Sequence, residues 1–249
     1  SPQVRELFCS GTTLGQVVQF KAGMSTGDNQ AFQRQWFEVA VSLLAYPSSS
    51  VVGNKARWFP CNRGGEFRKW YGNDLTVVDW QDSGRRIKAH SSSAVRNESC
   101  YFREGLTYNK ISIGRFAARF RGSGYVFDDT GRCIFPSSTE TSLHLILGFL
   151  CSAVADHFLR MLTPTVTFTS KELESVPWVG GSGSDQSVRE AVALSRTDWD
   201  NFETSWDFKD LPILREGTKS GTLAASWENW RDQCSSAIRR MQELETENN

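Results

Sequence analysis

The stretch Leu143–Leu162, with the sequence LHLILGFLCSAVADHFLRML, begins with the longest apolar run of this 249-residue chain. Its apolar residues recur every three to four positions, and Pro164 follows shortly after it. This spacing predicts one largely buried α-helix that ends before the proline. The run is too short for a membrane span, because Asp156 and Arg160 interrupt it.

The segments before this helix are rich in strand-forming residues, and glycine, asparagine and aspartate separate them. They predict a β-rich region with a strand over Thr12–Lys21 and two hairpins. The first hairpin is expected from Glu66–Tyr71 and Leu75–Trp80, and the second from Gly114–Phe120 and Tyr125–Phe127. The turn Asp129–Gly131 is expected to lead into a strand over Cys133–Phe135. The helix would pack on the resulting sheet, which makes the fold class α+β.

The remainder of the chain turns helical after a Gly/Ser-rich stretch. A short strand is expected over Thr165–Ser170, followed by a short helix with Ser170 at its N-cap. The run Gly180–Ser184 has the composition of a flexible linker. It predicts one domain at residues 1–180 and a small helical C-terminal region at residues 181–249, with helices over Asp185–Leu194 and Thr222–Glu247.

Charge is unevenly distributed although the formal net charge is zero. Residues 1–135 hold eighteen Lys and Arg against eleven Asp and Glu, whereas residues 136–249 hold ten against seventeen. This asymmetry indicates a basic surface for a polyanion on the first part of the chain.

Between residues 55 and 121 there are fourteen basic residues, mostly arginine, against six acids. Guanidinium groups can bond two acceptors of a guanine edge or of a phosphate, so this cluster favours DNA binding. The alternative is a solvated face on which arginine stems cover apolar surface. The expected contacts to bases or phosphates include Thr26 and Asn29 of the Gly-rich turn, and the basic candidates are Lys55, Arg57, Arg63, Arg68, Lys69, Lys110, Arg115, Arg119 and Arg121.

Catalytic and metal-binding patterns are absent from the sequence. There is no Gly-rich loop for a methyl donor and no (Asn/Asp)-Pro-Pro-aromatic motif to hold a flipped base. The three histidines and six cysteines show no metal-ligand spacing, so we expect free thiols and no metal site. Asp128 and Asp129 could form a nuclease site with Lys171 and Glu172, but the run Asp128–Gly131 is more typical of a turn.

Five segments carry a resemblance to a known family: STGDNQAFQRQWFEV (25–39), KARWFPCNRGGEFRKWYGN (55–73), REGLTYNKISIGRFAARF (103–120), LGFLCSAVADHFLRMLTPTVTFTSKELESVPW (147–178) and DWDNFETSWDFKDLP (198–212). They resemble the C-terminal half of the PglX-type adenine-specific DNA methyltransferases of BREX phage-exclusion systems. The first and fourth segments are similar to elements of target-recognition domains more widely. The fourth departs from that pattern, with Cys151-Ser152 where Asn-Ser is usual.

The resemblance implies a target-recognition part without the catalytic domain, which binds double-stranded DNA and does not itself catalyse. S-adenosylmethionine would serve the catalytic domain of the intact protein, and no cofactor is expected in this part. The implied partners are the methyltransferase domain in cis, other phage-exclusion proteins and an acidic phage protein that mimics DNA. Two alternatives are a scaffold that docks other defence proteins on its acidic helices, and a metal-dependent nuclease. The N-terminal residues lack the features of a signal peptide, which predicts a cytoplasmic location.

Overall fold

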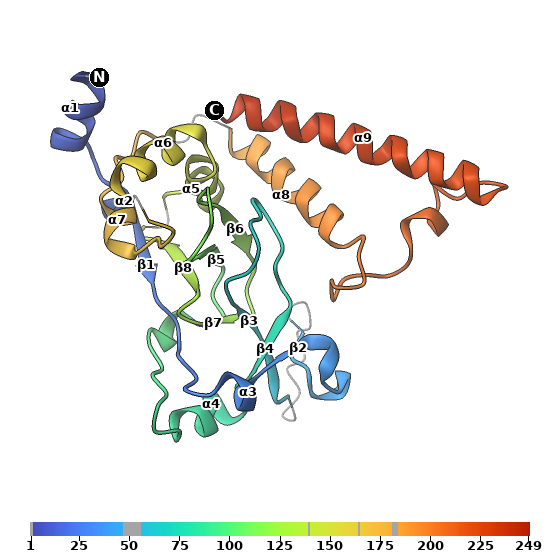
Figure 1. Ribbon diagram of the computed structural model, residues 1–249, viewed down its shortest axis with the longest axis horizontal. Helices are drawn as coiled ribbons and strands as arrows, with labels where there is room; N and C mark the ends of the chain where they lie inside the picture. The colour runs from blue at the N-terminus through green and yellow to red at the C-terminus, as the bar shows by residue number, and fades with distance from the viewer. Residues whose placement is uncertain (1, 47–55, 139, 164, 181–183) are drawn as a thin grey trace.

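The computed structural model describes residues 2–46, 56–138, 140–163, 165–180 and 184–249, and their strands form two sheets (Figure 1). The antiparallel first sheet has the order β1 (Val18–Lys21), β8 (Gly131–Pro136), β5 (Gly105–Asn109) and β6 (Ala118–Arg121). The second has the order β2 (Gln33–Gln35), β4 (Thr76–Asp79), β3 (Trp58–Asn62) and β7 (Val126–Phe127), with β3 and β7 parallel. The expected α+β fold class is confirmed.

Short helices precede and connect the strands, and longer helices follow them. The first group is α1 (Pro2–Ser10), α2 (Leu14–Val17), α3 (Asn29–Phe32) and α4 (Gln81–Lys88), with 3₁₀ turns η1 (Trp36–Glu38), η2 (Val41–Leu43) and η3 (Glu98–Cys100). The second group is α5 (Leu143–Leu150), α6 (Ala153–Leu162), α7 (Ser170–Glu174), α8 (Asp185–Trp199), η4 (Pro212–Leu214) and α9 (Leu223–Glu247).

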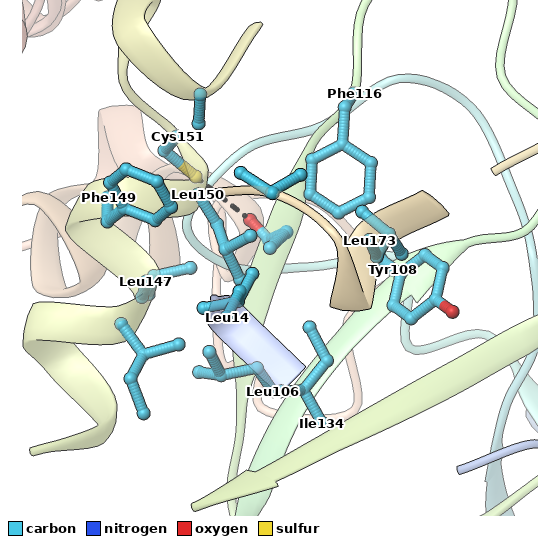
Figure 2. Packing of buried hydrophobic residues seen from close by; sticks show 14 of the residues in the cluster. Leu14, Leu106, Tyr108, Phe116, Ile134, Leu147, Phe149, Leu150, Cys151 and Leu173 are labelled. Carbon is cyan, nitrogen blue, oxygen red and sulfur yellow. Dashed lines mark hydrogen bonds between the residues drawn. The ribbon is translucent and has the colours of Figure 1, made fainter. Parts of the chain in front are cut away.

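The main core lies where α5, α6 and α7 cover the first sheet (Figure 2). Leu106 of β5, Ile134 of β8 and Leu147 of α5 are fully buried in it. A smaller apolar cluster, which includes Val78 and Phe127, belongs to the second sheet and its surroundings. Burial of the apolar side chains of α5 against the sheet is the expected consequence of their helical spacing.

The apolar stretch forms two helices, so the prediction of one helix was wrong. Helices α5 and α6 are bent by 64° at the break between them. The side chain of Ser152 caps α6 by accepting from Ala155 N at 3.2 Å, and its hydroxyl donates to Phe149 O at 2.7 Å. This cap begins a new helix within the apolar run. Pro164 lies outside the described residues, and no single described helix is long and apolar enough to cross a membrane.

The first predicted hairpin was also wrong, because both edges of β4 are taken by other strands. β4 pairs with β2 on one side and with β3 on the other. The run Glu66–Tyr71 is not a strand, and its Trp70 instead bridges β6 with a positive φ of 70°. Trp70 N donates to Ala118 O at 3.0 Å, and Phe120 N donates to Trp70 O at 2.8 Å.

The second predicted hairpin was wrong for a related reason. β6 pairs with β5 in the first sheet, whereas β7 pairs with β3 in the second, so residues 122–125 cross between the sheets. The strand after the Asp129–Gly131 turn is confirmed as β8. The expected strand over Thr12–Lys21 is a strand only from Val18, and Thr167 makes an isolated bridge in place of a strand. The N-cap of α7 is Thr169, one residue before the predicted Ser170.

Both predicted C-terminal helices are present as α8 and α9, and both contribute residues to the main core. Val188 and Ala191 of α8 and Leu244 of α9 are buried with the residues of the first sheet. Helix α8 lies so close to α5 that a Cβ at Gly148 would be 2.8 Å from Val188. The predicted domain boundary falls at residues 181–183, outside the described residues, and stays a prediction.

Candidate nucleic-acid interface

The Gly-rich turn before α3 has a fixed local structure. Gly27 has a φ of 76°, a conformation that glycine adopts without steric cost. Asp28 caps α3 by accepting from Ala31 N at 2.9 Å, and Thr26 Oγ1 donates to Asn29 Oδ1 at 2.7 Å. Thr26 is buried and Asn29 is exposed, so the turn presents Asn29 to a ligand and keeps Thr26 as its support.

Next to this turn, β2 and the loop after β3 border a groove of about 440 Å³. All of its lining side chains are polar, and four of them are amides: Asn29, Gln30, Gln33, Arg34, Gln35, Glu38, Arg63 and Thr76. Amide and guanidinium groups are the types that bond adenine and guanine edges in the major groove of DNA. We call this set the polar groove.

The two arginines of the polar groove are held differently. Arg34 Nη1 donates to the main-chain oxygens of Gln30 and Gln33, and its guanidinium lies over the Trp58 ring at 5.8 Å. Arg63 Nε lies 3.8 Å from Asp128 Oδ2, and the Arg63 side chain is 40% exposed. The main chain therefore binds one of the two terminal nitrogens of Arg34, whereas the Arg63 side chain remains accessible.

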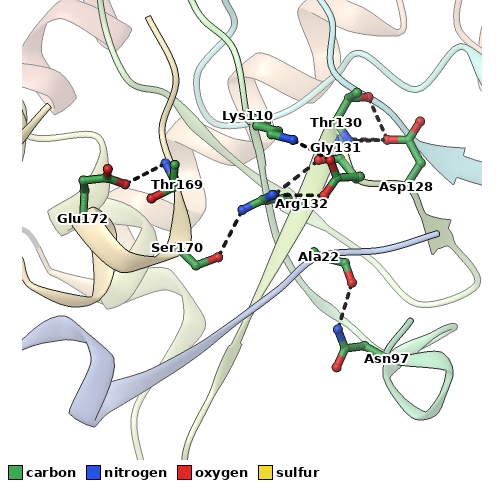
Figure 3. Close-up of polar contacts among 11 residues, drawn as sticks. Ala22, Asn97, Lys110, Asp128, Thr130, Gly131, Arg132, Thr169, Ser170 and Glu172 are labelled. Carbon is green, nitrogen blue, oxygen red and sulfur yellow. Dashed lines mark hydrogen bonds and ion pairs between the residues drawn. The ribbon is translucent and has the colours of Figure 1, made fainter. Parts of the chain in front are cut away.

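Asp128 is a turn residue, as the composition of its segment predicts. Its Oδ1 accepts from Thr130 N at 2.8 Å, Thr130 Oγ1 at 2.7 Å and Gly131 N at 2.9 Å (Figure 3). Its Oδ2 points away from the turn in Figure 3 and is the atom nearest to Arg63. Gln33 Nε2 also donates to Oδ2, at 3.4 Å.

The carboxylates of the nuclease alternative are occupied by structural contacts. Asp129 binds Lys110 at 2.5 Å and Arg132 at 3.0 Å (Figure 3). Glu172 accepts from Thr169 N at 3.1 Å, within the first turn of α7. Among the described residues, no group of three or more His, Cys, Asp or Glu is arranged to hold a metal ion.

Three of the other expected DNA contacts lie outside the lining of the polar groove. Arg68 binds Asp198 of α8 at 2.6 Å, and Lys69 binds Glu245 of α9 at 3.2 Å. Together with Arg115 they line a separate hollow of about 400 Å³ beside these helices. Two of these three cations, Arg68 and Lys69, therefore join α8 and α9 to the segment that follows β3.

Arg57 and Lys110 are each held by a carboxylate, and one candidate is not described. Arg57 binds Asp79 at 2.9 Å and shares it with Arg86. Lys110 binds Asp129, as noted above. Lys55 lies outside the described residues.

The expectation that Arg119 and Arg121 contact DNA needs correction, because both side chains are buried. Arg119 is 1% exposed and Arg121 is 2% exposed. Arg119 Nη2 donates to Asn109 Oδ1 at 2.7 Å, and Arg121 Nη1 donates to Asn62 Oδ1 at 3.4 Å. The alternation of β6 points these long side chains inward, where buried oxygen acceptors bind them.

Buried Asp74 lies near the two arginines and has an altered pKa. Burial raises the pKa of the Asp74 carboxyl to about 7, and the positive charges of Arg119 and Arg121 oppose this rise. Burial also lowers the pKa of the Arg119 guanidinium to about 10, and Asp74 opposes that change. Asn62 Nδ2 donates to Asp74 Oδ1 at 3.4 Å, so Asn62 bonds both Arg121 and Asp74.

Sequence reasoning missed Gln30, Gln33, Arg34 and Gln35 as members of the polar groove. The signal was present, because the run Asn29–Gln35 contains four amides and an arginine within seven residues. The aromatic residues in and beside this run are typical of a packed core, and glutamine carries no charge, so charge patterning does not mark these residues.

Two known proteins are similar to this chain, while no family model matches it. The adenine-specific methyltransferase PglX of Lacticaseibacillus casei (strain Zhang) is 32% identical over 254 residues, which cover 96% of this chain and 21% of that protein. The adenine-specific methyltransferase BrxX of Escherichia coli O9:H4 (strain HS) is 28% identical over 213 residues, which cover 85% and 17%. The chain spans about a fifth of the length of these relatives. It is therefore homologous to a segment of the PglX and BrxX adenine-specific methyltransferases.

Proposed function

We propose that this chain recognises double-stranded DNA in a sequence-specific manner for an adenine-specific DNA methyltransferase of a phage-exclusion system. The polar groove carries the proposal, because it gathers amide and guanidinium side chains beside a rigid turn. Each good bidentate contact of such a side chain to a base edge discriminates by about 1–3 kcal/mol. The similarity to PglX and BrxX supports DNA as the ligand.

Methyl transfer is assigned to residues outside this chain. Dinucleotide-type folds bind adenosyl groups at a Gly-rich turn between a parallel strand and a helix. The only parallel strand pair among the described residues, β3 with β7, is two residues long, and no Gly-rich turn joins it to a helix. The described residues lack this arrangement, which supports our proposal that this chain binds DNA without catalysing.

Selection from a random duplex pool tests the proposal. The 249-residue chain is incubated with the pool at low and at moderate salt, and the retained duplexes are sequenced. We expect an enriched motif that contains an adenine. We also expect weaker retention at moderate salt, since a protein that contacts about six phosphates loses orders of magnitude in affinity over this range.

The outcomes separate this proposal from its alternatives. If the chain retains duplexes without an enriched motif, it contacts phosphates and does not read bases. If it retains no duplex, the scaffold alternative is favoured. Cleavage that depends on magnesium or manganese would favour the nuclease alternative, and Asp129→Ala would then abolish it.

One proposed partner besides DNA follows from the same surface. An acidic phage protein that mimics DNA would compete with duplex DNA for the polar groove and its surroundings. Competition between such a mimic and the selected duplex, measured by fluorescence anisotropy, tests this: independent binding of the two would contradict it. The methyltransferase domain and other phage-exclusion proteins are proposed partners by similarity alone.

A further inference from the structure

Arg63 follows β3 directly, and the turn Asp128–Gly131 holds its main chain on both sides. Asp128 N donates to Asn62 O at 3.1 Å, and Gly64 N donates to Thr130 Oγ1 at 3.1 Å. Gly131 packs so closely that a Cβ there would lie 2.6 Å from Arg63 Cα. The starting point of the Arg63 side chain is therefore fixed before any ligand arrives.

The carboxylate of Asp128 also restricts the direction of the Arg63 side chain. Three hydrogen bonds from the turn hold Asp128 Oδ1, which leaves Oδ2 in a set direction (Figure 3). Oδ2 lies 3.8 Å from Arg63 Nε, on one edge of the guanidinium. Among the described residues, neither Nη1 nor Nη2 of Arg63 makes a hydrogen bond or ion pair, so these donors remain available in the polar groove.

The neighbouring arginines do not combine a restricted side-chain direction with two available terminal nitrogens. In Arg34, main-chain oxygens bind Nη1, one of the two terminal nitrogens that a guanine contact would use. In Arg57, the carboxylate of Asp79 binds Nε and Nη2. Bidentate recognition requires two donors in one plane, held in a fixed direction. The guanidinium of an arginine supplies such a pair, and the ammonium of a lysine does not.

We infer that Arg63 reads a guanine, donating from its two terminal nitrogens to O6 and N7 in the major groove, and that Asp128 is the residue that positions it. The inference rests on the proposed function of the polar groove. It names one specificity-determining residue and predicts a guanine at one position of the recognised sequence.

Two substitutions in the 249-residue chain test the inference by selection from the random duplex pool. Arg63→Lys keeps the positive charge and removes the fork. Asp128→Asn keeps an oxygen acceptor for the turn, since asparagine is suited to such turns, and places an amide donor where Oδ2 faced Arg63. The matched controls are Arg160→Lys and Asp156→Asn on α6, which alter an arginine–aspartate pair joined through the same two atoms at 2.8 Å.

We expect Arg63→Lys to lower the preference for guanine at one motif position by about 5- to 150-fold while the other positions stay unchanged. Asp128→Asn should lower the preference at the same position by a smaller factor, and the controls should leave the motif intact. If Asp128→Asn lowers the melting temperature, the test rests on Arg63→Lys alone. The Arg63 side chain is 40% exposed, so we expect its substitution to leave the fold intact.

Other outcomes would overturn the inference in distinguishable ways. If Arg63→Lys leaves every motif position unchanged, Arg63 contacts phosphate at most, and the proposed function stands without this inference. If the unsubstituted chain selects no motif, the proposed function fails and the inference fails with it.

Discussion

Arg119 and Arg121, which resemble surface cations in the sequence, are both buried, and Arg121 connects the two sheets from the inside. Arg121 of β6 in the first sheet bonds Asn62 of β3 in the second, and Asn62 also bonds Asp74. Removing one member of such a buried set leaves another charge without compensation, which typically costs about 3–5 kcal/mol. These side chains therefore stabilise the region that carries the polar groove, and their burial keeps them from direct contact with DNA.

At the same scale, Asp74 predicts a pH dependence of stability. Its pKa is raised to about 7 by burial, so between about pH 4 and pH 7 the folded state holds a proton that the unfolded state has released. The contribution of Asp74 to the free energy of unfolding is therefore fully present below about pH 4 and is lost as the pH rises toward 7. We expect Asp74→Asn to remove this fall, which is on the order of a few kcal/mol.

The measurement is the free energy of unfolding in urea at several pH values for the unsubstituted chain and for Asp74→Asn. Burial lowers the pKa of His144, which makes stability rise with pH below its ordinary value, but this contribution is common to both chains. Asp156→Asn on α6 serves as the control. Equal slopes against pH for the unsubstituted chain and Asp74→Asn would contradict the prediction.

At the scale of elements, the break between α5 and α6 depends on a single side chain. Ser152 is 4% exposed, accepts from Ala155 N and donates to Phe149 O. We expect Ser152→Ala to lower the free energy of unfolding by about 1–2 kcal/mol, because it removes the cap and leaves both groups without this partner. Thermal and urea unfolding measure the loss.

A second N-cap of the same residue type provides the comparison. Ser184 caps α8 by accepting from Ser187 N at 3.0 Å, and it is exposed to solvent. Water can replace that bond, so Ser184→Ala should cost less than Ser152→Ala. An equal or larger loss for Ser184→Ala would show that burial of the Ser152 cap is not what makes it important.

At the scale of the whole molecule, α8 and α9 form an arm that projects to one side (Figure 1). The segment between the two helices returns to the second sheet's surroundings, where Trp36 Nε1 donates to Thr204 O at 2.9 Å. Arg240 of α9 binds Glu190 of α8 at 2.7 Å, and the two helices enclose a hollow of about 430 Å³. Residues 185–249 hold eight basic residues against thirteen acids. This negative balance opposes contact with DNA, whose phosphates carry the same sign of charge.

Substitution of exposed apolar residues on the arm tests whether the arm lies outside the path of bound DNA. Trp227 is 54% exposed and Ile238 is 59% exposed. We expect the double variant Trp227→Ser and Ile238→Ser to retain the selected duplex with unchanged affinity and motif, in contrast to Arg63→Lys. Circular dichroism checks that the helices remain. A changed motif or weaker retention would place part of the DNA path on the arm.

The sequence by itself determined the fold class, the strand β8 after its turn, and the helices α8 and α9. These depend on local signals, namely apolar spacing and turn composition, which act within a few residues. The resemblance to a methyltransferase family was likewise carried by contiguous segments and is confirmed by the similarity to PglX and BrxX.

Only the tertiary structure decided which strands pair and which cations are accessible. Composition predicted Glu66–Tyr71 as the neighbour of β4, but β2 and β3 occupy its two edges. Arg119 and Arg63 are alike in sequence, yet strand alternation buries the first and a turn on a distant segment holds the second at the surface. Long-range packing sets both outcomes, because pairing and burial depend on residues far apart in the chain.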